Sequence, residues 1–328
     1  MHIAINGWFA KQLTTGSGHY LEQLLRHLPA VMGEAGMSAS AGGAGQAHKL
    51  SLLLPFPHRA YRLTAIHTTY PAVEVIGVRL PPLPGQLRKL CWEQIAVPLA
   101  ARRLDADLLW VPYWAAPLWQ PCPVIVTVHD IIHRILPAYH GGILQRLYTQ
   151  LVSYTAQRAA AMITVSHAAG RDITTALAPA DDRLHIVYNG LPANPAYSAD
   201  DFAAIRRKYQ LPKRFFLYLG GFDRRKNVPT TLAAYKRYLD KGGDPAVQLV
   251  IAGELPTVDS TFSPDPRRIA AELMLTDHVH FCGYVEEEEK AALYALATAY
   301  IFPGLYEGFG LMVLEAMQAG TPVITSAR

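Results

Sequence analysis

The chain has 328 residues, of which 51% are hydrophobic and 17% charged, with 24 glycines and 24 prolines, and this composition excludes a disordered or fibrous protein. No apolar run reaches the roughly 18 residues of a membrane-spanning helix, and residues 1–10 lack the basic segment of a secretory signal, so we predict a cytoplasmic protein. The formal net charge of +4 arises in residues 1–195, with 15 basic and 10 acidic side chains against 15 and 16 afterwards, which fits either scattered solvated charge or a surface that meets anionic lipid or an anionic substrate.

The first part of the chain alternates predicted strands and helices. Residues 2–7 have the apolar pattern of a buried strand, and a glycine turn and an amphipathic helix follow. Residues 33–48 are small and polar without periodicity, so we predict a flexible surface loop. Further apolar runs typical of buried strands lie at residues 49–55, 72–78, 106–112, 123–130, 160–166 and 184–190, with helices at 90–104 and 143–160.

The same pattern restarts after residues 189–201, which are rich in Pro, Asn and Asp. Strands are predicted at residues 214–219, 247–253, 278–285, 297–304 and 321–327, and helices at 228–241, 267–274, 286–297 and 310–319. Alternating strands and helices predict parallel sheets with helices on both faces, here as two similar α/β domains, residues 1–192 and 193–328. Because no helix follows the last strand, we expect a C-terminal closing segment to be missing.

Two glutamates stand in an apolar and glycine-rich stretch between Tyr306 and Gly320. Glu307 precedes the predicted helix at 310–319, and Glu315 lies more than one turn inside it, so both can face one ligand. A helix N-terminus beyond a strand offers unpaired N–H groups and about half a positive charge to a phosphate, and carboxylates accept hydroxyl hydrogen bonds from sugars. We expect positions 311, 314 and 316–319 to be buried, which favours partnered acids over a capping or solvent-facing pair.

A basic loop forms the second predicted site. The strand that ends at Leu219 leads into GGFDRRKN, residues 220–227, and then into a helix with proline near its first turn. Arg224, Arg225 and Lys226 therefore lie at the carboxyl end of a strand, where cations can hold a diphosphate and stabilise it as a leaving group. A solvated basic loop is the alternative. We expect the two sites to face each other at one sheet edge.

The basic loop, followed about eighty residues later by the E-x7-E segment, resembles the retaining nucleotide-sugar glycosyltransferases of family 4. The resemblance extends over nearly the whole chain, since VTVHD (residues 126–130), ITVS and YNG occur in the order of that family. It implies the GT-B fold, in which two Rossmann-like domains face a cleft. The first domain would be the acceptor side, and the second would bind the nucleotide sugar.

The resemblance also implies a role for each matching residue. Glu307 would contact the donor sugar near its anomeric centre, Glu315 would bind the ribose, and Lys226 would hold the diphosphate. The family's usual arginine stands five positions before that lysine, but this chain has Gly221 there, and Arg225 is the substitute that we predict. His129 would touch the donor sugar. The loop residues that would contact the donor are Gly308, Phe309, Gly310 and Leu311 after one strand and Gly16, Ser17 and Gly18 near the start of the chain.

No metal site is predicted. Three cysteines, Cys91, Cys122 and Cys282, lie far apart without CxxC spacing, and the spacing of His129 and His133 has no third ligand nearby. The resemblance likewise implies chemistry without a metal ion, with the nucleoside-diphosphate sugar as co-substrate and no other cofactor.

The resemblance implies the retaining transfer of a hexose, such as mannose, to a hydroxyl of a glycan or lipid-linked acceptor. The family's usual acceptors are bacterial surface polysaccharides and lipopolysaccharides. A basic N-terminal domain would suit peripheral contact with the inner face of a membrane, although residues 87–103 also fit a packed helix with basic ends. We expect no nucleic-acid partner.

Other readings of the function stay open. A non-catalytic or truncated sugar-nucleotide-binding module would bind nucleotide without turnover, and a GT-B sugar-nucleotide epimerase would convert the donor without an acceptor. The segment after the first strand lacks the G-x-G-x-x-G spacing of a dinucleotide-dependent oxidoreductase.

Overall fold

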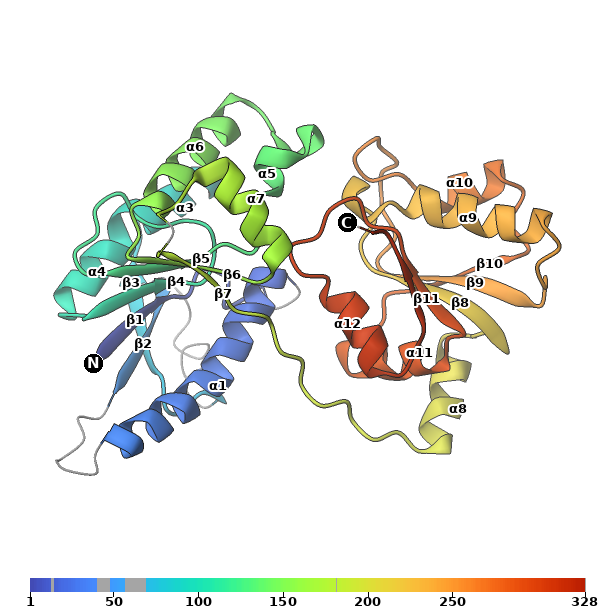
Figure 1. The fold of residues 1–328 in the computed structure, drawn as a ribbon, viewed down its shortest axis with the longest axis horizontal. Coiled ribbons are helices and arrows are strands. Elements are labelled where there is room, and N and C mark those ends of the chain that lie inside the picture. The colour runs from blue at the N-terminus through green and yellow to red at the C-terminus, as the bar shows by residue number, and fades with distance from the viewer. Residues whose placement is uncertain (13–14, 40–47, 57–68, 181, 328) are drawn as a thin grey trace. The chain divides into compact units, whose positions relative to one another are not determined.

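A computed structural model describes residues 1–12, 15–39, 48–56, 69–180 and 182–327 (Figure 1). The chain packs into two compact units, Met1–Tyr188 and Asn189–Arg328. Each unit is built around a parallel sheet, which agrees with the two Rossmann-like domains of the predicted fold class. No described helix is both long and apolar enough to cross a membrane.

Within the described residues, the sheet of the first unit has seven strands in the order β3-β2-β1-β4-β5-β6-β7. These strands are β1 (His2–Asn6), β2 (Lys49–Phe56), β3 (Glu74–Arg79), β4 (Leu108–Val111), β5 (Val124–Thr127), β6 (Ala161–Thr164) and β7 (Leu184–Ile186). Chain order reverses between β1 and β4, and ligands of open α/β sheets bind beyond the carboxyl ends of the strands at such a reversal.

Helices cover both faces of this sheet (Figure 1). They are α1 (Gly16–Ala39), α3 (Gly85–Cys91), α4 (Val97–Arg103), α5 (Ile132–Ile135), α6 (Ile143–Gln157) and α7 (His167–Leu177), with a π-helical turn η1 (Trp92–Ala96) and a 3-10 turn η2 (Pro137–Tyr139). Side chains alternate along a strand, so Leu52 and Leu54 of β2 pack with α1, whereas Leu53 joins the core under α4, α6 and α7. Burial on both faces explains why these strands are continuously apolar in sequence.

The sheet of the second unit has five strands among the described residues, in the order β10-β9-β8-β11-β12. These strands are β8 (Arg214–Leu219), β9 (Val247–Ala252), β10 (Val279–Gly283), β11 (Ala299–Phe302) and β12 (Val323–Thr325). The helices are α8 (Ala199–Lys208), α9 (Val228–Asp240), α10 (Pro266–Glu272), α11 (Lys290–Leu296) and α12 (Leu311–Gln318), with 3-10 turns η3 (Arg224–Lys226) and η4 (Glu287–Glu289). Figure 1 shows α9 and α10 on one face of this sheet and α11 and α12 on the other.

Two local predictions were wrong or incomplete. The loop predicted at residues 33–48 begins too early, because α1 continues to Ala39; residues 40–47 lie outside the described residues. Extending a formed helix is much easier than nucleating one, and Glu34, Ala35 and Met37 have high helix propensity. Helices α5, α7 and α8 were not predicted, although two of them have local signals. The Ser166 hydroxyl caps α7 by accepting from Ala169 N at 3.0 Å, and Ser198 and Asp201 form a capping box at the start of α8.

Candidate functional site

Two loops leave the sheet of the second unit at one edge. Strands β8 and β11 are neighbours, and chain order reverses between them. Residues 220–227 follow β8 and residues 303–310 follow β11, so both loops start beyond the carboxyl ends of adjacent parallel strands. The basic loop and the first glutamate of the E-x7-E segment therefore meet where open α/β sheets bind ligands.

Glu307 joins the two loops through two ion pairs. One of its carboxylate oxygens accepts from Arg225 Nη1 at 2.9 Å, and the other accepts from Lys226 Nζ at 2.8 Å. The backbone fixes the same junction, because Leu305 N donates to the Arg225 carbonyl at 2.6 Å. We call Arg225, Lys226 and Glu307 the cation–carboxylate cluster. Glu307 lies 82 residues after Arg225 and 81 after Lys226 in sequence, and the adjacency of β8 and β11 brings them together.

Lys226 is almost completely buried, with 6% of its surface exposed. Its Nζ lies 4.8 Å from the centre of the Phe302 ring, a favourable position for a cation. Burial lowers the pKa of Lys226, and the charge of Glu307 opposes that effect. An ammonium has three N–H donors, of which Glu307 accepts one, so this lysine can pair with Glu307 and with a ligand at the same time.

The three basic residues of the loop do not share one environment. Asp223 orients Arg225, since its Oδ1 lies 3.2 Å from Arg225 Nε and accepts from Arg225 N at 3.3 Å. Arg224, in contrast, is exposed, and its backbone N donates to the Phe262 carbonyl at 2.7 Å. The structure thus places Arg225 and Lys226, but not Arg224, against Glu307.

The helix after this junction begins with a glycine in the left-handed region. Gly310 is the N-cap of α12, with φ 86° and ψ 46°, and no side chain caps the helix. Side chains rarely adopt such a backbone, which accounts for glycine at this position. Gly308 and Phe309 complete the connection from Glu307, and Leu311 is the first helical residue, so all four predicted loop residues lie at the N-terminal end of α12.

Glu315 lies inside α12, where its carboxylate accepts a hydrogen bond from the Tyr294 hydroxyl at 3.2 Å. Tyr294 is fully buried, and burial together with the nearby Glu315 charge raises the pKa of its hydroxyl well above the ordinary value. Of the neighbouring positions that we expected to be buried, Ala316 is, but Met317 is 60% exposed and residue 318 is also exposed. Successive helical residues turn by about 100°, so a run of four cannot all face the sheet.

Gly221 is exposed and its carbonyl accepts from the Tyr218 hydroxyl at 2.5 Å. A side chain at this position would meet Asp223 Oδ2 at 3.6 Å, an ordinary contact. A Cβ therefore fits at this position, so crowding of the backbone does not explain why glycine replaces the arginine that the family resemblance expects. In this chain it is Arg225 that brings the second positive charge to Glu307.

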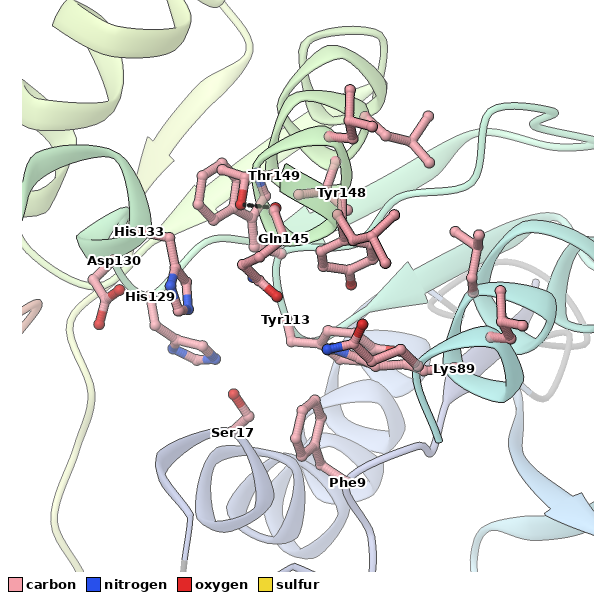
Figure 2. Close-up of a pocket in the computed structure, with 18 residues that line it drawn as sticks. Phe9, Ser17, Lys89, Tyr113, His129, Asp130, His133, Gln145, Tyr148 and Thr149 are labelled. Atoms are coloured by element: carbon pink, nitrogen blue, oxygen red, sulfur yellow. Dashed lines mark hydrogen bonds between the residues drawn. The ribbon is translucent and has the colours of Figure 1, made fainter. Parts of the chain in front are cut away.

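The first unit contains a pocket of about 720 Å3 that includes two residues predicted from sequence (Figure 2). Ser17, in the first turn of α1, and His129, two residues beyond β5, both line it. Gly16 begins the same helix, and Gly18 N donates to Thr15 Oγ1 at 3.2 Å, which caps α1. Of the glycine-loop residues, Ser17 is the one that lines the pocket.

One of the two ring nitrogens of His129 has a hydrogen-bond partner in the protein. Its Nε2 lies 3.0 Å from the Pro112 carbonyl, which can only accept, so Nε2 carries the hydrogen and Nδ1 is an acceptor. The ring also packs edge-on against Tyr20, with centroids 4.7 Å apart. Burial lowers the pKa of His129, so the imidazole is neutral at pH 7.

A lysine that lines this pocket, Lys89, and a buried acid behind it, Glu93, were not predicted as site residues. Glu93, on the π-helical turn η1, is 0% exposed and accepts from the Tyr148 hydroxyl at 2.8 Å; burial raises its pKa to about 7. Lys89 Nζ lies 3.6 Å from Glu93 Oε1 and 5.1–5.6 Å from the ring centres of Phe9, Tyr113 and Tyr148. An acid amid the apolar residues 90–97 was the available sequence signal. Among the described residues, no group of three or more His, Cys, Asp or Glu side chains is placed to hold a metal ion.

Two family models together match most of the chain. "Glycosyltransferase Family 4" matches residues 15–194, more than half of the sequence, and "Glycosyl transferases group 1" matches residues 201–328. The resemblance to family 4 that was identified from the motifs is thereby confirmed.

Three curated relatives are similar to the chain at 26% to 31% sequence identity. The chain is 30% identical over 215 residues to the O-antigen chain mannosyltransferase B of Escherichia coli, covering 62% of this chain and 52% of that protein. It is 31% identical over 204 residues to the glycogen synthase of Mycobacterium tuberculosis, covering 62% and 46%, and 26% identical over 248 residues to the O-antigen chain mannosyltransferase RfbU of Salmonella typhimurium, covering 74% and 63%. The matched region thus spans about half the length of these relatives.

Solved structures share the fold at low sequence identity. The sucrose-phosphate synthase of Thermosynechococcus elongatus superposes with a TM-score of 0.67 at 21% identity, covering 100% of this chain and 81% of that one. Anabaena Alr3699/HepE, solved in complex with UDP and glucose, gives a TM-score of 0.64 at 15% identity, covering 99% and 80%. These similarities, together with the two parallel sheets, confirm the GT-B fold class.

Proposed function

The chain belongs to glycosyltransferase family 4, and from this premise we propose that it is a retaining enzyme that moves a hexose from a nucleoside-diphosphate sugar to a hydroxyl of a glycan or lipid-linked acceptor. The observation that carries the proposal is the cation–carboxylate cluster at the strand-order reversal of the second sheet. The names of the O-antigen relatives favour mannose as the sugar.

The two cations of the cluster suit a diphosphate. Lys226 and Arg225 are cations with several N–H donors each, and we propose that they bind diphosphate oxygens beside Glu307. Positive charge fixed beside the leaving group stabilises the negative charge that develops on it. We propose that these side chains supply that charge without a metal ion, and that the amides of residues 308–311 assist at the N-terminal end of α12.

Glu307 then has a role at the sugar. As the bond from C1 of the sugar to the diphosphate oxygen breaks, the ring gains positive charge, which a carboxylate stabilises. The acceptor oxygen bonds to C1 on the same face, and its proton passes to the departing diphosphate oxygen. In this mechanism the leaving group is the base, and the protein contributes position and charge.

The remaining predicted residues keep supporting roles in the proposal. Glu315 would accept hydrogen bonds from the ribose hydroxyls, and Gly221 would leave room for the nucleotide. His129, through its unprotonated Nδ1, would accept from a sugar hydroxyl, and Ser17 with its neighbouring glycines would cover the phosphates and acceptor. The first predicted domain, residues 1–192, would hold the acceptor, and residues 193–328 would bind the donor.

Calorimetric titration with UDP, GDP and ADP tests the donor site. We expect one diphosphate to bind, and Lys226→Met to weaken it by roughly 10- to 100-fold, because a charge-assisted hydrogen bond is worth about 1.5–3 kcal/mol. Arg224→Met is the matched control, since it removes an exposed cation from the same loop and should change the affinity by less than about threefold. Equal losses in both variants would show that only the general charge of the loop matters and would refute the assignment.

Product analysis with the donor sugar that matches the bound nucleotide then tests the reaction. A glycosylated acceptor with the same anomeric configuration as the donor is the expected product. An epimerised donor formed without acceptor would identify an epimerase instead, and binding without any turnover would identify a binding module.

A further inference from the structure

The pocket of the first unit has a polar end and an apolar end. Figure 2 shows His129, Asp130 and His133 grouped at one side with Ser17 nearby, whereas Lys89 lies toward the other side. Five leucines of α3 and α6 also line the pocket, namely Leu87, Leu90, Leu144, Leu147 and Leu151. A ligand that fills the pocket therefore needs a polar part and an apolar part.

The apolar end continues into a second hollow of about 660 Å3. The two share Leu87, Leu90 and Leu151, and the second adds Ile95, Trp119 and the neighbouring apolar residues. We call the combined depression the α3–α6 groove. Several of its large side chains are strongly exposed, including Leu87 (56%), Leu144 (73%), Leu147 (56%) and Trp119 (48%). Contiguous apolar surface of this kind marks an interaction site, since monomeric proteins rarely expose it.

The charge around the apolar part of the groove is positive. Residues 80–104 and 131–158, which include α3, α4, α5 and α6, contain Glu93 as their one acid, and that side chain is fully buried, whereas Asp130 lines the pocket beside His129. The Nζ of Lys89 lies over the rings of Phe9, Tyr113 and Tyr148, which also line the pocket. An anionic group beside an apolar chain complements this arrangement, and a neutral sugar chain does not.

We propose that the α3–α6 groove binds the hydrocarbon chain of a lipid-linked acceptor, with the lipid's phosphate at Lys89 and its hydroxyl-bearing head group toward Ser17 and His129. This inference rests on the proposed function, because it names which of the two acceptor classes the enzyme uses. A free glycan would leave the exposed leucines in water, and a flat bilayer surface would not enter the pocket beside Lys89.

Dodecyl phosphate, used below its micellar concentration, tests the groove without any transfer reaction. We expect saturable binding that shifts the tryptophan emission to shorter wavelength, because Trp119 at the groove becomes covered. Inorganic phosphate lacks the chain and dodecyl maltoside lacks the anion, so each should bind at least about tenfold more weakly. Equal binding of dodecyl maltoside would refute a phosphate site at Lys89, and equal binding of inorganic phosphate would refute a chain site.

Two adjacent residues of α6 provide a matched pair of variants. Leu144 and Ile143 are 73% and 77% exposed, but Leu144 lines the pocket and Ile143 lines neither hollow. Leu144→Gln should weaken dodecyl phosphate binding by about fivefold, and Ile143→Gln should leave it unchanged. Equal weakening by both would mean general adsorption to an apolar face, as at a membrane surface, and would overturn the proposal.

Lys89→Met tests the anion site while keeping the packing of the lysine stem against the rings. Loss of the lysine charge raises the pKa of Glu93 further, so the protonated acid is favoured at neutral pH, which avoids a buried unpaired charge. We expect this variant to lose most of the difference in affinity between dodecyl phosphate and dodecyl maltoside. An unchanged difference, in a variant whose thermal unfolding matches the parent, would refute the role of Lys89.

The nucleotide titration separates the two proposals. Binding of dodecyl phosphate without binding of any nucleoside diphosphate would leave the groove assignment standing and refute the donor site. The opposite result would leave the donor site standing and refute the lipid-linked acceptor.

Discussion

The substitution Glu307→Gln separates the two tasks assigned to the cation–carboxylate cluster. It keeps the shape of the side chain and removes its negative charge, so Lys226 and Arg225 lose a shared counter-ion. We expect transfer to fall by at least about 100-fold, because a group that stabilises developing charge is removed. Nucleoside-diphosphate affinity should rise by roughly threefold to tenfold, since the two cations are no longer neutralised by the protein.

Glu307→Gln should also lower the free energy of unfolding, by an amount that follows from the distance between the paired charges. A charge pair at 2.8 Å in a medium of effective dielectric constant near 20 has a gross energy of about 6 kcal/mol. The side chain of Glu307 is 24% exposed, so water compensates much of this loss, and about 2 kcal/mol of unfolding free energy remains. For a unit of this size, the melting temperature falls by roughly 6 °C.

The stability loss in this variant should depend on pH with a definite sign. The pKa of Lys226 is already lowered by burial, and loss of Glu307 lowers it further. Between the folded and unfolded pKa values the unfolded chain binds more protons, so the stability of Glu307→Gln should increase as the pH rises toward the ordinary lysine pKa.

Thermal unfolding across pH 7–10, nucleotide titration and a transfer assay on one preparation check these expectations together. The parent protein is the control, and its unfolding should depend on pH less steeply in this range. Retained transfer in Glu307→Gln would refute the role at the sugar. Weakened nucleotide binding would refute the idea that Glu307 neutralises the diphosphate-binding cations.

Three further predictions follow from other parts of the structure. Glu315→Gln should weaken nucleoside-diphosphate binding by about tenfold and leave pyrophosphate binding unchanged, because pyrophosphate has no ribose; titration with both ligands checks this. Gly310→Ala should lower the unfolding free energy by about 1–2 kcal/mol, because its φ of 86° strains a side chain, whereas Gly16→Ala, with open space around it, should have little effect in the same thermal assay. Burial raises the pKa of Glu93 to about 7, so its contribution to stability is present below about pH 4.5 and disappears as the pH rises through 7; Glu93→Gln should remove this dependence, about 3 kcal/mol, from unfolding curves measured between pH 4.5 and 8.

Local hydrophobic patterns in the sequence were sufficient to predict much of the fold. Continuous apolar runs gave both sets of strands, because strands buried on both faces need apolar side chains at every position. The strand-loop-helix order around residues 220–227 and 303–310 was also predicted from the sequence, and it implied the sheet edge at which the two loops meet. Helices were harder, because the end of α1 depends on propagation from a helix already formed, and α8 was missed although the sequence contains its capping box of Ser198 and Asp201.

The sequence alone identified Glu307, Glu315 and Lys226 as a possible donor site, because charged residues in an apolar and glycine-rich setting are informative without neighbours. The family resemblance already favoured Arg225 over Arg224, but only the tertiary structure decided that Arg225 pairs with Glu307, because that contact depends on strand adjacency and on the turn of the loop. The burial of Glu93 beside Lys89 was likewise decided by packing. Which charged side chains contact one another depends on how elements far apart in sequence pack together. A local sequence pattern carries no information about that packing.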